Sequence, residues 1–414
     1  MKVLYLTSYF YPEDVASSYL GHNVREAIVN EGMDIVLYTP VPTRGVNNNL
    51  RKQYRTIKKD EVWYDGHMTI HRFNLMRERK NPILRAIRYV LQELKHFTCA
   101  VFAKDAKQCE VIKLSSTPPI HGMTAAFIKK IRHIPIIFDL QDIFPDSLAG
   151  TGLTKKGGLL WKIGRMIENF TYRNADKIIV ISEDFKKNIM AKGVPEEKIE
   201  VIYNWVDSDA VHPVSKEDNI LFEEFGISKD KFTVVYAGNL GNAQNIEIII
   251  DAASRLTGRD DIQFVIFGSG GLEDDIRKRI ETENLTNVTL LPIQPYERVS
   301  MVYGLGDIDI VSCKAGLGGS AMPSKTWSIM SCERPVLASF DEGELKEIIE
   351  KNGCGVFTHA GNVVEFIKAI ETLAADKERC KEMGKNARQF ILENLTKEVG
   401  TRKYIEVIKS VVKK

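Results

Sequence analysis

The chain has 414 residues, of which 44% are hydrophobic and 27% are charged, and its formal net charge is +2. This length suits two α/β cores of roughly 200 residues each, and the composition excludes a disordered chain. The near-neutral charge gives no global electrostatic argument for binding nucleic acid.

The six cysteines are scattered and form neither a Cys-x-x-Cys pair nor a cluster with histidines. A zinc site and a disulfide scaffold are therefore not expected. The N-terminal apolar run is broken at Thr7 and Ser8, unlike a signal peptide, and no window has about 18 uninterrupted apolar residues. We expect a cytoplasmic protein without a membrane span.

Short apolar runs alternate with helical patterns in the first half of the chain. The first run, Lys2–Thr7, precedes a polar loop and a helix near Ser18–Glu31 that Gly32 ends. Further strands are predicted at Asp34–Tyr38, Thr69–Phe73, Val111–Leu114, Ile134–Phe138, Lys177–Ile181 and Lys198–Ile202. Such alternation is typical of a parallel sheet with helices on both faces.

The second half repeats this pattern after a mixed, polar stretch at 204–231. Its strands are predicted from Phe232 and at Ile262–Phe267, Val288–Leu291, Ile308–Ser312 and Pro335–Ala338. Two such series predict two doubly wound, Rossmann-like domains, 1–207 and 208–395, with a cleft between them. We expect residues 396–414 to form a helix that packs back onto the first domain, as folds of this type often do.

Ligands of open parallel sheets bind beyond the carboxyl ends of the strands. The first such loop ends in Ala16, Ser17 and Ser18 at the start of a helix, where free backbone N–H groups suit a phosphate or a sugar hydroxyl. Ordinary capping by serine is an equally good explanation. The absence of G-x-G-x-x-G in this loop disfavours a nicotinamide site.

The loop DLQDIFPDS places three acids directly after the strand predicted at Ile134–Phe138. A carboxylate there can orient an acceptor hydroxyl, accept its proton or bind a metal. Helix capping by Asp142 or Asp146 is the alternative. We favour a functional Asp142, because it is the acid nearest the expected cleft.

Three loops of the second domain have binding character. GNLGNAQ (Gly238–Gln244) combines glycines with uncharged hydrogen-bonding side chains, and GSGG begins at Gly268. In KAGLGGSAMPSKTWSIMSC, a glycine-rich turn leads into a helix that Ser324 can cap and that Lys325 enters at its positive end. The helix dipole, free amides and one ammonium together suit a diphosphate. A solvated lysine on a capped helix is the alternative.

These loops, together with YFYPEDVASS, ADKIIVISEDFKKNIMAKGVPEEKIEVIYNWVD and MPSKTWSIMSCERPVLAS, carry a family resemblance over essentially the whole chain. The sequence resembles the retaining glycosyltransferases of family 4, which have the GT-B fold. It is most similar to the branch that builds bacterial capsule, O-antigen and exopolysaccharide units, including N-acetyl-L-fucosamine transferases. The resemblance implies a UDP-linked donor of an N-acetylated hexosamine or 6-deoxyhexosamine, without a metal cofactor and without nucleic acid.

The resemblance also assigns roles to individual residues. Asp142, with Gln141 where many relatives have histidine, would orient the acceptor as the catalytic residue. Ser320 and Ser328 stand where the broader family has two glutamates. The implied donor-binding residues are Ser17, Ser18, Gly238, Asn239, Gly241, Gln244, Gly268, Pro295, Gly319, Ser320, Ser324, Lys325 and Ser328.

The implied acceptor is lipid-linked, on undecaprenyl diphosphate, at the inner face of the cell membrane. The basic segment Arg77–Lys107 has Ile83, Leu84, Ile87, Val90, Leu91 and Leu94 at helical spacing, so it could lie on an anionic membrane. An amphipathic helix packed on the first domain is the alternative. Two other functions stay open: a nucleotide-sugar 2-epimerase of the same fold, and an inactive scaffold subunit, which Ser320 and Ser328 would suit.

Overall fold

The computed structural model describes residues 1–13, 18–79, 81–147 and 157–412, without the side chain of Ser320. Its contacts group the chain into two units, Met1–Tyr203 with Gly400–Lys414 and Asn204–Val399, and each unit is described by itself. Within the described ranges, no helix is both long and apolar enough to cross a membrane.

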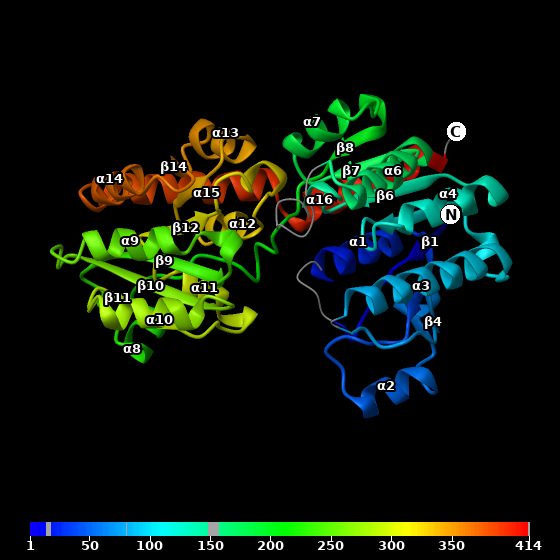
Figure 1. The fold of residues 1–414 in the computed structure, drawn as a ribbon, viewed down its shortest axis with the longest axis horizontal. Coiled ribbons are helices and arrows are strands. Elements are labelled where there is room, and N and C mark those ends of the chain that lie inside the picture. Colours follow the sequence, from blue (N-terminus) through cyan, green and yellow to red (C-terminus); the bar gives the residue numbers. More distant parts are fainter. Residues whose placement is uncertain (14–17, 80, 148–156, 413–414) are drawn as a thin grey trace. The chain divides into compact units, whose positions relative to one another are not determined.

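Unit 1 is built on an eight-stranded sheet with the order β3-β4-β2-β1-β5-β6-β7-β8 (Figure 1). Its strands are β1 (Lys2–Leu6), β2 (Asp34–Pro40), β3 (Asp60–Trp63), β4 (Met68–Phe73), β5 (Val111–Ser115), β6 (Ile136–Leu140), β7 (Lys177–Val180) and β8 (Ile199–Val201). All neighbouring strands run parallel except β3, which runs antiparallel to β4. The carboxyl ends of the parallel strands therefore share one edge.

The described helices of unit 1 are α1 (Ser18–Asn30), α2 (Asn48–Arg55), α3 (Pro82–Phe102), α4 (His121–Arg132), α6 (Leu159–Asn174), α7 (Glu183–Ala191) and most of α16 (Lys397–Val412). Three short 3₁₀ helices accompany them: η1 (Tyr64–Gly66), η2 (Ala106–Gln108) and η3 (Glu196–Lys198). Figure 1 shows α16, in red, among the elements of unit 1. Its Tyr404 hydroxyl donates to Asp139 Oδ2 at 3.1 Å, so this C-terminal helix is tied to β6.

Unit 2 is built on a six-stranded parallel sheet with the order β11-β10-β9-β12-β13-β14. The strands are β9 (Phe232–Asn239), β10 (Ile262–Ser269), β11 (Val288–Leu291), β12 (Ile308–Ser312), β13 (Val336–Phe340) and β14 (Gly355–His359). The helices are α8 (Leu221–Glu224), α9 (Glu247–Arg255), α10 (Glu273–Thr282), α11 (Val299–Tyr303), α12 (Lys325–Ser331), α13 (Glu344–Lys351), α14 (Val363–Ala374) and α15 (Lys377–Asn394), with 3₁₀ helices η4 (Asn242–Gln244), η5 (Tyr296–Arg298) and η6 (Gly318–Ser320).

Both faces of the unit 2 sheet are apolar and covered. Val234 of β9 belongs to a large core cluster with α9 and α14, whereas its neighbour Val235 belongs to a second cluster with α8 and α11. Successive side chains of a strand point to opposite faces, so this division is what two helical layers require. The predicted α/β fold with two doubly wound domains is confirmed.

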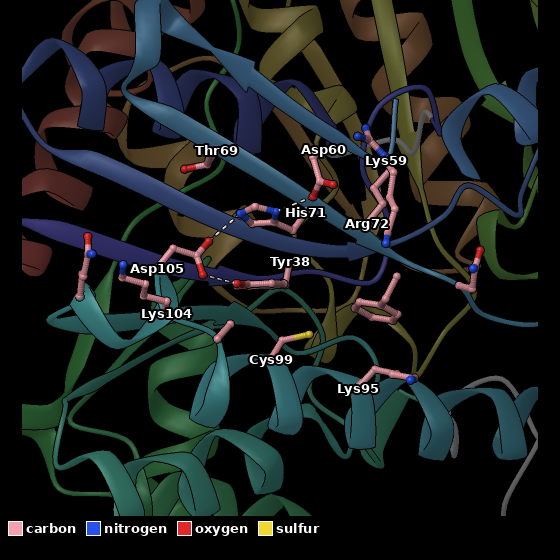
Figure 2. A pocket seen from close by; sticks show the side chains of 14 residues that line it. Tyr38, Lys59, Asp60, Thr69, His71, Arg72, Lys95, Cys99, Lys104 and Asp105 are labelled. Atoms are coloured by element: carbon pink, nitrogen blue, oxygen red, sulfur yellow. Dashed lines mark hydrogen bonds and ion pairs between the residues drawn. The ribbon is translucent and has the colours of Figure 1, made fainter. Parts of the chain in front are cut away.

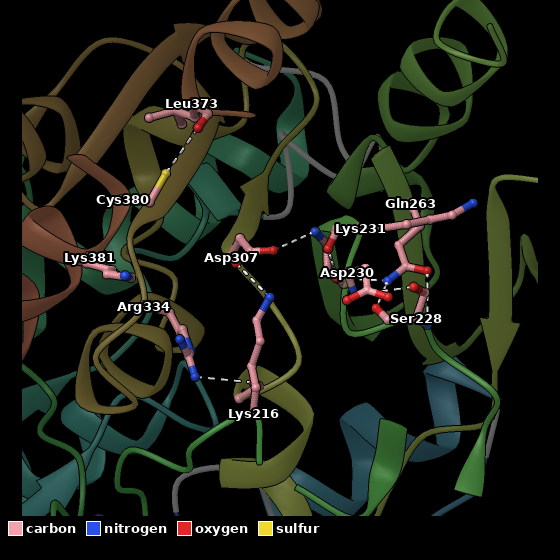
Figure 3. A network of polar contacts seen from close by, with 12 residues as sticks. Lys216, Ser228, Asp230, Lys231, Gln263, Asp307, Arg334, Leu373, Cys380 and Lys381 are labelled. Carbon is pink, nitrogen blue, oxygen red and sulfur yellow. Dashed lines mark hydrogen bonds and ion pairs between the residues drawn. The ribbon is translucent and has the colours of Figure 1, made fainter. Parts of the chain in front are cut away.

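A polar network secures the amino-terminal edge of the unit 2 sheet (Figure 3). Asp307 accepts from Lys216 Nζ at 2.8 Å and from the Thr233 amide at 2.8 Å, which ties the start of β9 to the segment before β12. This edge is opposite to the one where ligands of parallel sheets bind. The network is therefore structural.

One predicted strand has a shifted register, with consequences for the site. The strand predicted at Ile134–Phe138 is observed at Ile136–Leu140. His133 ends α4 in the left-handed conformation, and Pro135 has no amide to donate to the sheet, so the strand begins two residues later. Asp139, predicted to begin the loop, is instead a buried strand residue. The sequence prediction also missed β3 and β14.

Candidate active site

The ammonium of Lys325 lies at the carboxyl edge of the unit 2 sheet. Lys325 is the first residue of α12, and its Nζ is buried without a hydrogen-bond partner among the described residues. The Nζ atom stands 4.1 Å from the centroid of the Tyr236 ring, a cation–π contact from β9. Burial lowers the pKa of Lys325 to about 8. A buried cation whose only described neighbour of opposite character is an aromatic face is a strong attractor for an anion.

Gly238 explains why this lysine can approach the strand end. Its φ of +148° is one that L side chains rarely adopt, and a Cβ placed on it would stand 2.6 Å from Lys325 Nζ. Any side chain here would displace the ammonium. Two residues that were each predicted to bind the donor, Gly238 and Lys325, therefore lie side by side.

The loop after β9 packs closely against the end of β10. A Cβ on Gly268 would lie 2.5 Å from the Gly238 carbonyl oxygen, and one on Gly270 would lie 2.5 Å from the Leu240 carbonyl oxygen. These glycines are therefore needed for backbone packing. For Gly268 the structure shows this packing role, and its predicted role in donor binding stays a prediction.

Asn239 and Gln244 form a small polar platform on the same loop. Asn239 Nδ2 donates to Gln244 Oε1 at 3.2 Å, and both side chains face Gly241, where a Cβ would lie 2.8 Å from Asn239 Nδ2. Ser312 at the end of β12 donates to the Gln244 carbonyl at 2.6 Å and holds the loop in place. Four of the predicted donor residues, Gly238, Asn239, Gly241 and Gln244, are therefore brought together.

The glycine-rich turn before α12 is held by an acid that the sequence analysis missed. Asp341, directly after β13, accepts from the amides of Gly316 at 3.0 Å and Gly318 at 2.7 Å. Tyr236, the ring under Lys325, was also missed. In the sequence, Tyr236 looks like an ordinary aromatic residue of a buried strand. Its contact with the Lys325 ammonium is apparent only once α12 is placed beside β9.

The other predicted donor residues have varied positions. Ser324 precedes α12 with φ −58° and ψ −25° and makes no side-chain cap; the expectation that it caps the helix is wrong, because a capping side chain needs extended backbone. Ser328 is half-buried on α12, whereas Pro295, just before η5, and Gly319, within η6, are exposed. Ser18 begins α1 in unit 1. Ser17 and the Ser320 side chain lie outside the described residues.

The three acids of DLQDIFPDS have different surroundings. Asp139 is buried and accepts from Lys113 Nζ at 2.8 Å, and Asp146 pairs with Lys192 Nζ at 2.7 Å. Asp142 is exposed and has no ion-pair or hydrogen-bond partner among the described residues. The surrounding protein partly desolvates its carboxyl and raises its pKa above the usual value. Of the three acids, only Asp142 has no partner among the residues that the structure describes.

The surface hollow in Figure 2 contains none of the predicted site residues. It encloses about 750 Å³ between β4 and the end of α3. His71 lies between Asp60 and Asp105, at 2.6 Å from each, and Tyr38 donates to Asp105 at 2.6 Å. These groups contact one another as ion pairs and a hydrogen bond, in contrast to Lys325 Nζ, which has no hydrogen-bond partner among the described residues.

The α3 helix is inverted relative to an ordinary amphipathic helix. Its polar face is buried, with Arg88, Gln92, Glu93 and His96 among its buried residues. Its apolar side chains face outward, and Ile83 is 70% and Leu94 58% exposed. The sequence analysis gave a helix whose apolar residues pack on the first domain as the alternative to membrane contact. This alternative is wrong for most of these residues, because their side chains are exposed. Such exposed apolar surface usually marks an interaction site.

Comparison with known proteins places this geometry in a defined class. The Glycosyltransferase Family 4 model matches residues 21–210, and the Glycosyl transferases group 1 model matches residues 217–390. The chain is therefore an enzyme of glycosyltransferase family 4 (group 1), with the GT-B fold.

Individual relatives agree with this assignment. The chain is 24% identical over 339 residues to the probable glycosyltransferase WbjE of Pseudomonas aeruginosa, covering 81% of this chain and 83% of the relative. It is 27% identical over 290 residues to the putative colanic acid biosynthesis glycosyl transferase WcaI of Escherichia coli K12, covering 68% and 69%. Anabaena HepE, solved with UDP and glucose, superposes with a TM-score of 0.70 at 16% identity over 99% of this chain and 100% of that one.

Proposed function

We propose that this enzyme transfers a sugar from a UDP-linked donor to a lipid-linked acceptor with retention of configuration, in the synthesis of a bacterial surface polysaccharide. The observation that carries the donor half is the buried, unpaired ammonium of Lys325 beside Gly238. The donor sugar we propose is an N-acetylated hexosamine or 6-deoxyhexosamine, in line with the branch that the sequence resembles.

The donor diphosphate would be the missing partner of Lys325. As the bond to the sugar breaks, negative charge grows on the departing diphosphate, and a fixed cation in a desolvated place stabilises that charge strongly. The nearby backbone of Gly238 is open to close approach because it has no side chain. UDP is favoured as the nucleotide because the solved relative HepE binds UDP and UDP-glucose.

Asp142 would act on the acceptor. It is the one acid of its loop without a described ion-pair or hydrogen-bond partner, so its carboxylate is available to accept a hydrogen bond from an acceptor hydroxyl. In a retaining reaction with attack from the face of the leaving group, the departing phosphate helps to take the proton, and Asp142 would orient the hydroxyl rather than form a covalent bond.

A lipid-linked acceptor is supported by the outward apolar face of α3. Exposed apolar side chains are also found on α4, at Phe127 and Ile131, and on α6, at Leu160 and Met166; α4 packs against both α3 and α6. A cavity of about 600 Å³ beside Leu94 is also lined by Arg51, Arg55, Arg77 and Lys95. Apolar surface beside cations suits an anionic membrane surface.

A nucleotide panel tests the donor half. Thermal unfolding is followed with UDP-, GDP-, dTDP- and CMP-linked sugars, and released nucleotide is measured with and without a lipid-linked acceptor. UDP-sugars should stabilise the wild-type protein most, and K325M should abolish the shift while the exposed control K351M keeps it. A sugar change without acceptor-dependent UDP release would indicate an epimerase. The absence of both shift and turnover would contradict the proposal.

A vesicle assay tests the acceptor half. The double variant I87S/L94S should lose binding to vesicles that contain phosphatidylglycerol, whereas V364S, at an exposed apolar position in unit 2, should retain it. Arg85 is the basic position to neutralise on α3, because Arg88 is fully buried and donates to Thr43 Oγ1 at 3.0 Å. Equal binding by wild type and I87S/L94S would remove the membrane role of α3.

A further inference from the structure

Unit 1 contains a group of buried polar atoms that the proposed transfer reaction does not use. Six buried atoms form no hydrogen bond with any residue that the structure describes: both ring nitrogens of His96, both ring nitrogens of His121, Glu93 Oε2 and Gln92 Oε1. His96 and His121 are fully buried, and Glu93 is 6% exposed. Buried polar groups in native proteins are almost always paired, so atoms gathered in this way are expected to bind water or an ion.

Three of these side chains place one ligand atom each within a small region of the interior. The ligand atoms of Glu93, His96 and His121 all lie within 4.8 Å of one another, and His96 Nδ1 stands 3.6 Å from Glu93 Oε1. The two imidazole rings stack at 5.1 Å between centroids with 13° between their planes. A tetrahedral ion has its ligand atoms roughly 3.3 Å apart, so the widest of these separations would have to close by up to about 1.5 Å. Because an imidazole binds a metal in the plane of its ring and the two planes are nearly parallel, one ring would also have to rotate about its side-chain bonds.

The sequence supports this convergence locally. Glu93 and His96 are three residues apart on α3, so both project from the same buried face of the helix. His121 is the first residue of α4, which packs against α3. The backbone groups of Ser115 and Thr117 lie near the His121 ring without reaching hydrogen-bond geometry, and such groups commonly orient a metal-binding histidine.

We propose that Glu93, His96 and His121 bind one Zn²⁺ ion in the interior of unit 1. Two imidazoles and one carboxylate form a donor set that zinc accepts, and Gln92 Oε1 or the second oxygen of Glu93 can complete four-fold coordination. The ion is structural. Gln92 Nε2 donates to Ser8 Oγ at 2.7 Å, and Ser8 Oγ donates to the Thr117 carbonyl at 3.1 Å, so the ion would fix α3 and α4 to the carboxyl edge of the sheet.

This site is separate from the donor chemistry, because Lys325 and the glycine loops belong to unit 2. It also differs from the zinc sites that the sequence analysis considered, which depended on cysteine pairs. All six cysteines are free, and none belongs to this group. The failure of one proposal therefore leaves the other intact.

Metal content and stability of the wild-type chain test the proposal directly. The full chain, purified without a metal-affinity step and dialysed against a chelator, is titrated with ZnCl₂, and bound metal is measured by mass spectrometry. We expect one zinc per chain and a rise in Tm of about 5 °C. Less than one-tenth equivalent of zinc with an unchanged Tm would overturn the proposal.

Variants and a spectroscopic substitute identify the ligands. H96A/H121A and E93Q should lose at least tenfold in zinc affinity, and H133N, which changes an exposed histidine in the left-handed position after α4, should retain it. Co²⁺ in the wild-type chain should give visible bands without thiolate charge transfer, a readout that does not require the variants to fold. Thiolate bands, or undiminished zinc binding by H96A/H121A, would overturn the proposal.

Discussion

Two buried ammonium groups, at Lys113 in unit 1 and Lys325 in unit 2, have opposite surroundings. Lys113 Nζ pairs with Asp139 at 2.8 Å. Burial alone would lower the pKa of Lys113, but the Asp139 carboxylate outweighs it and the pKa is raised. Lys325 has no such partner among the described residues, and burial lowers its pKa to about 8.

The comparison distinguishes a lysine that stabilises the fold, Lys113, from one whose charge can bind a ligand, Lys325. Lys113 and Asp139 neutralise each other in β5 and β6, so their contribution is to the stability of unit 1. Lys325 gives the fold an unpaired buried charge, which costs free energy until an anion arrives. Four predictions test this contrast, from the largest expected effect to the smallest.

The first prediction breaks the satisfied pair. K113M should lower the free energy of unfolding of unit 1 by about 3–5 kcal/mol, because Asp139 is left buried without its cation. Urea unfolding followed by far-UV circular dichroism measures this. The double variant K113M/D139L should recover part of the loss, since an apolar pair of similar size often replaces a buried ion pair, whereas the Tyr404 hydroxyl loses its acceptor. A loss below about 1 kcal/mol for K113M would show that the pair contributes little.

The second prediction removes the unsatisfied charge. K325M should reduce kcat/KM by about 100-fold, or ~2.7 kcal/mol, because the leaving diphosphate loses its cation. Its Tm should equal or exceed that of the wild type, because no partner is left behind. K325R, which keeps the charge, is the control and should retain more activity. Activity within threefold of wild type in K325M would contradict the assigned role.

The third prediction contrasts two acids of one loop. D142N should lower kcat about 30-fold, or ~2 kcal/mol, with an unchanged Kd for UDP, because Asp142 is proposed to orient the acceptor and not the donor. D146N should instead lower Tm, because it removes one of the two carboxylates that pair with Lys192, the other being Glu168. Steady-state kinetics and thermal unfolding of both variants separate these effects. A kcat of D142N near the wild-type value would show that Asp142 does not orient the acceptor.

The sequence predicted the fold well because its signal is repeated and local. Apolar strand runs such as KVLYLT and FTVVYAG lie within one or two residues of β1 and β9. The misses are elements with a weak apolar signal. The edge strand β3 reads DEVW, and its exposed or half-buried side chains contribute little to a core. The predicted start of one strand was wrong, because β6 begins at Ile136, after Pro135, and not at Ile134.

The sequence indicated the candidate binding residues themselves, but not the residues that contact and hold them in place. Lys325 and the Gly238 loop could be predicted, because glycines after a strand and a lysine entering a helix are local patterns. Tyr236 and Asp341 could not, because their roles depend on which distant segment lies beside them. The same limit applies to Glu93, His96 and His121, whose convergence needs α3 and α4 packed together.

The fourth prediction is a pH dependence of donor binding. With a pKa of about 8, Lys325 is about nine-tenths deprotonated at pH 9 in the free protein, so the Kd for UDP should rise about tenfold between pH 7 and pH 9. K325R should show a nearly flat profile over this range. In the absence of nucleotide, the native state binds fewer protons than the unfolded state between pH 8 and about 10.4, so Lys325 should make stability rise with pH in that window. Isothermal titration calorimetry with UDP measures the first effect, and a flat wild-type profile would show that the ammonium does not face the diphosphate.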